Sequence, residues 1–594
     1  MKSIIFAGAA SVAAIAALSA SVSMREASDA VALTSLSPID IARSVCGDDA
    51  DAMRKRRAFF VSAAAAWADE LDAGDGVDLG LAPNEHIKHA ISTDSSDAQA
   101  LFNEGLAHMW NFNHGAAIAS FKQAQAADPA CAMCYWAESL AHGPNINAPM
   151  VEEAVAPAFA ALTMAVANKG SATEKEQALI DALAARYAKN PPADRAPLDL
   201  AFAEAMDALT ATYPEDDFIA ALAAEANMDT QPWNYWAADG STPIGRTART
   251  ISLIEGVLAR NPNHIAAIHL YIHITEATDN PYRAAKYADR LDKLSPGLGH
   301  LIHMPSHTYF KIGRFKQSMD NNARAVLADE AFIAANDASI LYEFGYYTHN
   351  VHFLMASAQM AGDAELALDM AKKLDAKLPT DMAIAVPFAQ PIKAAPYYAM
   401  AQMGDPNDVL ALEKPSEAAP FLVGAWRYAR AEALVKLGEF DKARAEAEAI
   451  SSIYADADLS SLTDNGIPAD EILKIAHMTA LGKAAAGRGD LGSGIEALEA
   501  AVEMQDKIAY TEPPYWYYPA RQTLASMVLK SGDAERAEQL FMETLVKSPN
   551  NAWAYYGLSE AFKAQGDKSG GKMAQRLMKQ SWAGDKNALS LDRL

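Results

Sequence analysis

Seven of the fourteen histidines in this 594-residue sequence gather in three short segments, where they could bind a metal ion. Neutral imidazole is a ligand that suits copper, zinc, iron and nickel. Within each segment the histidines are three or four residues apart, which places them on one face of a helix. The predicted metal ligands are His269, His273, His300, His303, His307, His349 and His352.

The first two histidine segments repeat each other at a fixed distance. His269 and His303 are 34 residues apart, and so are His273 and His307. This distance is the period of the tetratricopeptide repeat (TPR), in which each repeat is a pair of helices. In this register the seven histidines occupy positions 2, 5 and 9 of the first helix of successive repeats. That face lines the concave groove of such arrays, so stacked helices would bring the histidines together.

Prolines and glycines extend the same register. Pro262 and Pro296 both fall at position 32, where a proline ends the second helix of a repeat. An insertion at 333–347 breaks the strict spacing, and an earlier repeat begins near residue 98. The glycines expected in the turn between the two helices, at position 15, are Gly313, Gly362, Gly438, Gly489, Gly532 and Gly566.

Composition agrees with a helical protein. Apolar residues make up 51% of the chain, and it is rich in alanine and leucine without long alternating runs of β-branched residues. We therefore predict an all-α, TPR-like superhelix that could close on itself. The net charge of −25 argues against nucleic acid and anionic membrane surfaces as partners.

The sequence divides into six parts. The predicted parts are a signal peptide (1–23), a helical and loop segment (24–97), N-terminal repeats (98–230), an aromatic loop with a connecting helix (231–261), histidine-bearing repeats (262–380) and C-terminal repeats (381–594).

The N-terminal segment MKSIIFAGAASVAAIAALSASVS has one lysine, a long apolar stretch and small residues after it. This pattern is typical of a secretory signal peptide that is cleaved, and an uncleaved anchor helix is the alternative. The mature protein would then be periplasmic or secreted, with no stable membrane insertion, in a compartment where disulfides persist.

Cys131 and Cys134 form a CxxC sequence followed by Tyr135, not by the histidine of a haem attachment site. We expect a local disulfide between them. A pair of buried thiols or a metal contact is the alternative. Cys46 has no obvious partner.

The histidine segments favour copper. A site of nearly pure imidazole with Met304 nearby suits copper first and zinc second, and an iron site that uses Glu276 comes third. The segment HLYIH has Leu270 where a zinc peptidase has its general-base glutamate, so a peptidase is not predicted. The alternatives are that the histidines only pack and hydrogen-bond, or that they form a pH sensor.

Two aromatic, proline-rich loops, at 228–243 and 509–522, could close over the groove. They offer Trp233, Trp236 and Trp516 as pocket-lining residues and Asp239, Glu512, Tyr517 and Arg521 as candidate catalytic residues.

The runs CAMCYW, GHLIHMPSH and EPPYWYYPAR resemble those of a family of exported bacterial TPR proteins, over about residues 85–560. The resemblance implies the repeat fold and identifies the histidine segments and the EPPxWYYPxR loop as family features. It implies no activity.

We therefore expect an exported TPR-fold metalloprotein, with a copper-dependent oxidoreductase acting on a small molecule or peptide in its groove as the favoured function. The alternatives are a protein-interaction scaffold with structural histidines and a metal carrier without catalysis.

Overall fold

A computed structural model describes residues 84–594, except residues 238 and 586–587. The predicted signal peptide, Cys46 and most of the segment 24–97 lie outside the described residues. The described part is helical and contains no β-strand, only an isolated bridge between Trp236 and Pro243. No helix in this part is long and apolar enough to cross a membrane.

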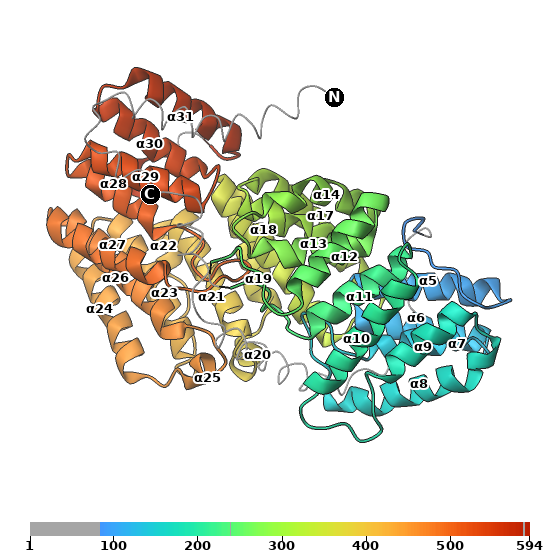
Figure 1. The fold of residues 1–594 in the computed structure, drawn as a ribbon. Coiled ribbons are helices and arrows are strands. Elements are labelled where there is room, and N and C mark those ends of the chain that lie inside the picture. The colour runs from blue at the N-terminus through green and yellow to red at the C-terminus, as the bar shows by residue number, and fades with distance from the viewer. Residues whose placement is uncertain (1–83, 238, 586–587) are drawn as a thin grey trace.

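The chain forms successive helix pairs, each packed against the next (Figure 1). The N-terminal helices are α5 (Ser96–Trp110), α6 (His114–Ala127), α7 (Ala132–Ala141), α8 (Val155–Asn168), α9 (Glu174–Ala184), α10 (Ala196–Thr212), α11 (Asp217–Asp229) and α12 (Thr247–Arg260). The central elements are α13 (Ile265–Glu276), α14 (Tyr282–Leu294), α15 (Gly299–His303), α16 (Pro305–Lys311), α17 (Phe315–Ala335), the π-helix η5 (Leu341–Tyr346), α18 (Tyr347–Ala361) and α19 (Ala364–Lys377).

The C-terminal half continues the same design. Its helices are α20 (Thr380–Ala385), α21 (Ala389–Met403), α22 (Pro406–Leu410), α23 (Pro420–Lys436), α24 (Phe440–Asp456), α25 (Ser460–Thr463), α26 (Ala469–Gly487), α27 (Leu491–Gln505), α28 (Ala520–Lys530), α29 (Ala534–Lys547), α30 (Ala552–Ala564) and α31 (Lys568–Ser581). Short 3₁₀ turns are η3 (Glu152–Ala154), η4 (Lys169–Ser171) and η7 (Leu591–Arg593). The prediction of an all-α, TPR-like superhelix is confirmed.

Side-chain caps begin many of these helices. Ser95 accepts a hydrogen bond from the backbone of Ala98 at the start of α5, and Asp363 does the same for Leu366 in α19. Such caps satisfy backbone N–H groups that have no partner inside the helix. At α13 the cap is a histidine, because Nδ1 of His264 accepts from the Ala267 N–H at 3.2 Å.

The turn glycines confirm the register. All six that were expected at position 15 have a positive φ, from 71° at Gly313 to 99° at Gly532. This left-handed conformation carries little penalty for glycine and a larger one for other residues. Close helix packing also needs small residues, since a Cβ on Gly105 would lie 2.3 Å from the ring of Phe121.

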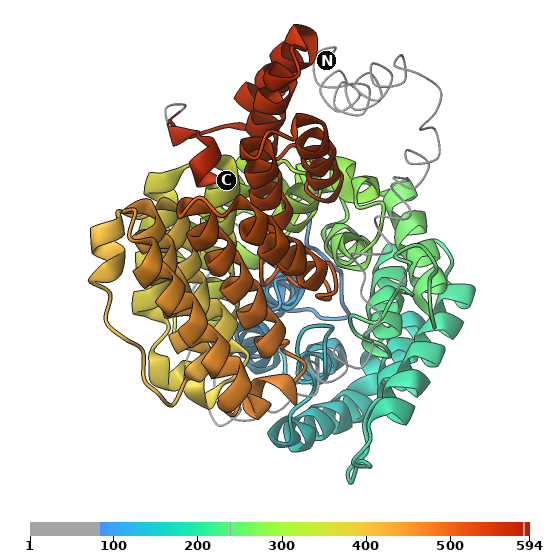
Figure 2. The ribbon, with the colours of Figure 1, turned by 90° about the vertical axis from the view of Figure 1, so that its left-hand side faces the viewer.

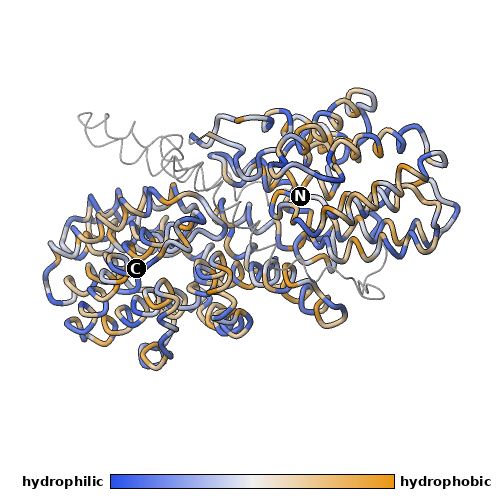
Figure 3. The backbone as a smooth tube through the Cα atoms, turned by 90° about the horizontal axis from the view of Figure 1, so that it is seen from below, coloured by the Kyte–Doolittle hydropathy of each residue, from blue (hydrophilic) through white to orange (hydrophobic). Residues whose placement is uncertain are grey.

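Most helices bury one side and expose the other, and Figure 3 shows hydrophobic and hydrophilic residues alternating along most of them. Helices α13 and α15 are exceptions, because every residue in them is buried. The largest apolar core extends through the first helices as far as Tyr346, and further clusters follow in the C-terminal half.

The superhelix curves so that distant repeats meet at the central ones (Figure 2). From the N-terminal side, Asn111 Oδ1 accepts a hydrogen bond from the Leu301 N–H at 3.1 Å. From the C-terminal side, the indole N–H of Trp553 donates to the Gln359 carbonyl at 3.0 Å. Helix α5 also contacts α13, and α30 contacts α18. Both ends of the array contribute to the surroundings of the histidine segments.

Candidate metal centre

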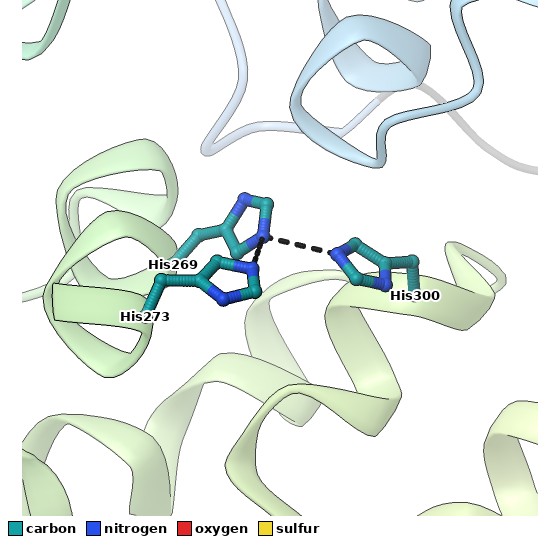
Figure 4. A group of neighbouring side chains, drawn as sticks. All are labelled: His269, His273 and His300. Carbon is teal, nitrogen blue, oxygen red and sulfur yellow. Dashed lines mark hydrogen bonds between the residues drawn. The ribbon is translucent and has the colours of Figure 1, made fainter. Parts of the chain in front are cut away.

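Three histidines from α13 and α15 form a first triad. Nε2 of His269 lies 3.1 Å from Nε2 of His273 and 3.1 Å from Nε2 of His300. Figure 4 shows the three rings turned toward one another, two from one helix and one from its neighbour. All three side chains are buried. The nitrogen atoms are close enough to hold one ion between them.

Three further histidines form a second triad beside the first. Nε2 of His303 lies 2.6 Å from Nε2 of His307 and 3.1 Å from Nε2 of His349. These residues belong to α15, α16 and α18. His303 and His307 are buried, and His349 is partly exposed.

The two triads are one arrangement repeated. Each takes its residues at positions 5 and 9 from one repeat and its third residue, at position 2, from the next repeat. The third residue follows position 5 by 31 residues in the first triad and by 46 in the second, and the difference is the insertion 333–347. The insertion contains the π-helix η5, which leads into α18 and so presents His349.

His352 belongs to neither triad. It occupies position 5 of a third repeat, but position 9 of that repeat is Ala356. A third triad therefore lacks its second ligand. His352 instead lines a cavity next to the two triads, and its Nε2 has no hydrogen-bond partner among the described residues.

The helix that was expected over 299–312 is divided in two. Pro305 has no N–H to donate, and α15 ends at His303 before α16 begins at Pro305. Met304 at the break keeps helical φ and ψ of −50° and −38°, so the three histidines still follow one another, with ring centroids 6.0 Å apart for His300 and His303 and 4.6 Å apart for His303 and His307. Two of them join the second triad, and His300 joins the first.

The triads lie side by side. The ring centroids of His273 and His307 are 5.8 Å apart, and those of His300 and His303 are 6.0 Å apart. One phenylalanine covers each triad. Phe112 lies 4.5 to 5.9 Å from the rings of the first triad, and Phe353 lies 4.9 to 5.5 Å from those of the second.

In three of these imidazoles, the Nδ1 atom lies close to a polar side chain. Nδ1 of His303 lies 2.5 Å from Oδ1 of Asn322 in α17. Nδ1 of His307 lies 2.7 Å from Glu276 and 2.5 Å from Glu512, which comes from the loop before α28. Glu276 also lies 3.3 Å from Nδ1 of His273 and therefore touches one ring of each triad. Such contacts orient a ligating histidine, with Nε2 toward the ion.

Burial keeps most of these imidazoles neutral, as metal ligands must be. Desolvation first, and then neighbouring histidines, hold the pKa of each first-triad imidazole well below the usual value. The pKa values of His303 and His349 are lowered for the same reasons.

His307 differs from the other five. Burial lowers its pKa, but the carboxylates of Glu512 and Glu276 outweigh burial and raise the pKa to about 10. Burial and the charge of Glu512 raise the pKa of Glu276 well above its usual value. The pKa of Glu512 is lowered, although burial opposes this, because His307 faces it.

A cavity of about 230 Å³ opens onto the triads. His273, His300, His307 and His349 form part of its wall, whereas His269 and His303 lie behind them. The rest of the wall comes from the α7–η3 turn, the Trp233 loop, η5, α18, α21 and the 510–517 loop. The cavity is mostly apolar and aromatic.

The two aromatic loops contribute unequally to this cavity. Trp233, Glu512 and Tyr517 line it, as expected. The other candidates lie elsewhere.

The indole N–H of Trp236 donates a hydrogen bond to the Ile274 carbonyl, and Trp516 packs on Tyr398 and Tyr428. Asp239 accepts hydrogen bonds from backbone N–H groups in its own turn, and Arg521 forms ion pairs with Asp506 and Glu543. Met304 is buried in the apolar core.

Phe112 was missed from the sequence, although the register contains a signal for it. In the repeat that begins at residue 98, position 15 is Phe112, where six other repeats have glycine. Its φ is 56°, in the left-handed region. A bulky residue held there costs about 1–3 kcal/mol and points to a special role. Trp233 is also in the left-handed region, with a φ of 61°, and its ring centroid lies 5.3 Å from that of His273.

Asn322 and Phe353 were also missed. Neither has a sequence signal of its own, because a buried asparagine or phenylalanine in a helix is common packing. The expected disulfide between Cys131 and Cys134 is confirmed, at the start of α7.

Comparisons with known proteins add little to these observations. No family model and no curated protein matches the sequence. The solved structures that align with it include a human IFIT1 dimer with m7Gppp-AAAA, at 12% identity over 90% of this chain and 95% of that one, with a TM-score of 0.29. Yeast Tom70 aligns at 12% identity over 81% of this chain and 92% of that one, with a TM-score of 0.25. At such TM-scores these likenesses carry no argument about function.

Proposed function

We propose that the protein is an exported metal-dependent oxidoreductase with a dinuclear centre, one ion in each histidine triad and copper as the favoured metal. The observation that carries the proposal is the pair of adjacent triads, each with three Nε2 atoms that converge on one point. Packing alone does not require six imidazoles from three repeats to turn their nitrogen atoms toward one another.

The spacing of the nitrogen atoms supports an ion in each triad. Ligands at tetrahedral angles around an ion with M–N near 2.0 Å are about 3.3 Å apart. Within the two triads, three of the distances between Nε2 atoms are 3.1 Å and one is 2.6 Å. The shortest, between His303 and His307, would lengthen slightly around an ion. Without an ion, facing imidazole nitrogens can pair only as donor and acceptor.

The donor set favours copper. Six imidazoles with no thiolate among them suit copper or zinc, and His307 would release its proton when the ion binds. Glu276, which was considered as a ligand of an iron site, faces the Nδ1 atoms of His273 and His307, on the side away from the converging Nε2 atoms. Two adjacent three-histidine sites could hold a copper pair, which supplies two electrons to dioxygen.

The surroundings favour an enzyme over a carrier. A catalytic metal site keeps a coordination position open, whereas a structural site is closed. Each triad supplies three ligands, and both face a cavity large enough for a small molecule. The Cys131–Cys134 disulfide agrees with export, since disulfides persist in oxidising compartments.

Metal analysis tests the proposal. Protein made without a histidine tag, stripped and reconstituted with copper, should hold about two equivalents after gel filtration. After reduction, two Cu(I) ions should transfer two electrons to one dioxygen, so an oxygen electrode should record about one dioxygen consumed per copper pair. Less than about a tenth of an equivalent of copper, zinc or iron after reconstitution would refute the metal centre. Full loading without dioxygen uptake would favour a carrier.

A further inference from the structure

The cavity beside the triads has a composition that selects among ligands. We propose that it binds an uncharged molecule of one or two aromatic rings that carries a group able both to donate and to accept hydrogen bonds, such as a phenolic hydroxyl. This inference rests on the proposed function, because it names the substrate class of that centre.

The size and walls of the cavity suit aromatic rings. An apolar cavity of about 150 Å³ is large enough to bind benzene, and this one has about 230 Å³. Its wall includes the aromatic side chains of Trp233, Phe344, Tyr346, Phe388 and Tyr517. Aromatic rings gain from offset or edge-to-face contact with such side chains, in addition to the apolar area that they bury.

Away from the metal centre, the side chains of the cavity offer nothing to balance a charge. Among the described residues that line it there is no lysine, arginine or aspartate, and the single carboxylate, Glu512, already faces His307. A charged group placed there would lose its hydration without gaining an opposite charge, which costs far more than burying a neutral polar group. The part of the substrate that fills the cavity beside the ions is therefore uncharged.

Most polar atoms of the wall already have partners. Asn145 accepts from the Asn147 and Ala148 N–H groups, and Asn147 accepts from the indole N–H of Trp233. The Thr511 hydroxyl donates to the Pro513 carbonyl.

Apart from the triad imidazoles and Glu512, two polar groups of the wall remain unpaired. Nε2 of His352 and the hydroxyl of Tyr398 are buried and have no hydrogen-bond partner among the described residues. Buried polar atoms nearly always have a partner, so these two are places for one that a ligand brings.

The location of His352 orients the ligand. It follows the second-triad residue His349 by three residues on α18, which is one helical turn. A hydroxyl bound at His352 therefore lies about 5 Å along this helix from the second triad, and the ring lies beside the metal centre.

Calorimetry with three matched probes tests the inference on the full chain, with and without copper. 2-Naphthol should bind one to one. 2-Methylnaphthalene, which has no hydroxyl, should bind about tenfold more weakly, and 2-naphthoate, which is charged, should show no binding to the copper-free chain. Tyr398→Phe and His352→Phe should each weaken 2-naphthol binding and leave 2-methylnaphthalene unchanged. Ala395→Phe should block both neutral probes, since Ala395 lines the cavity.

The outcomes separate the two proposals. Protein that takes up copper but, before copper is added, binds 2-naphthoate as well as 2-naphthol, or binds neither, refutes the substrate class and leaves the metal centre intact. Protein that binds 2-naphthol but no metal refutes the proposed function instead. An unchanged preference for the hydroxyl in both Tyr398→Phe and His352→Phe would show that these residues do not recognise it. Thermal unfolding checks that each variant is folded.

Discussion

The first and second triads have the same ligands at the same repeat positions, but their surroundings differ. The first is covered by Phe112 from the N-terminal repeats, and a carboxyl group, that of Glu276, faces only one of its rings, His273. The second is held by Asn322 and by a carboxylate pair, one member of which arrives from the C-terminal loop. Duplication of a repeat can therefore produce two similar sites, while closure of the superhelix makes them unequal. We expect the two ions to differ in affinity.

The largest effect should come from removing ligands of one triad at a time. His269→Ala with His273→Ala and, separately, His303→Ala with His307→Ala should each remove about one of two metal equivalents and abolish dioxygen uptake, because each leaves one ligand in its triad. Elemental analysis after gel filtration measures the loss. His352→Ala is the matched control and should keep both ions. Loss of all metal in only one of the double variants would show a single site.

Substitution of the two carboxylates, Glu276 and Glu512, should show which triad each of them stabilises. Glu276 touches His273 and His307, and Glu512 touches only His307. Glu276→Gln should therefore weaken both sites, and Glu512→Gln only the second, by about 10–100-fold in metal affinity. Competition with a chelator of known affinity gives the two dissociation constants. Equal effects of both variants on the second site alone would mean that the 3.3 Å contact with His273 contributes nothing.

Substitution of the phenylalanine that covers each triad should have a smaller effect, confined to the site that it covers. Phe112→Leu should lower affinity at the first site by about tenfold, and Phe353→Leu should do the same at the second, because each ring packs against three imidazoles of one triad. The same chelator competition resolves the two sites. If Phe112→Leu affects both sites equally, its ring acts on the repeat array as a whole and not on the first triad.

The repeat register explains what could be predicted from the sequence. The four-residue spacing placed His269 with His273 and His303 with His307, the 34-residue period put the two pairs in register, and the turn glycines placed the helices. Local periodicity does not show where the superhelix closes, so it did not reveal Phe112, nor that Glu512 would reach His307. It also did not show that Arg521 and Asp239 would find partners away from the groove. His352 occupies position 5 and was therefore predicted to be a ligand. Position 9 of its repeat is Ala356, and this missing histidine is the sequence feature that indicates that His352 belongs to neither triad.

A histidine outside both triads provides a reference for the pH dependence of the triads. His108 on α5 is fully buried, and burial lowers its pKa from 6.5 to about 3. Below about pH 6.5 the unfolded chain binds a proton that the folded chain does not, so stability is lost as the pH falls. His108→Leu should reduce the loss between pH 7 and pH 5 by about 2 kcal/mol, because one pKa unit corresponds to about 1.4 kcal/mol.

Urea unfolding at the two pH values, with and without copper, measures this difference. The gain in His108→Leu should be the same in both forms, since His108 belongs to neither triad. The remaining acid sensitivity should depend on copper, because the triad imidazoles compete for protons and metal through the same nitrogen atoms. Copper could instead change the acid sensitivity due to His108 as much as it changes the remaining acid sensitivity. In that case the pH dependence of stability would not distinguish the triad imidazoles from other buried histidines.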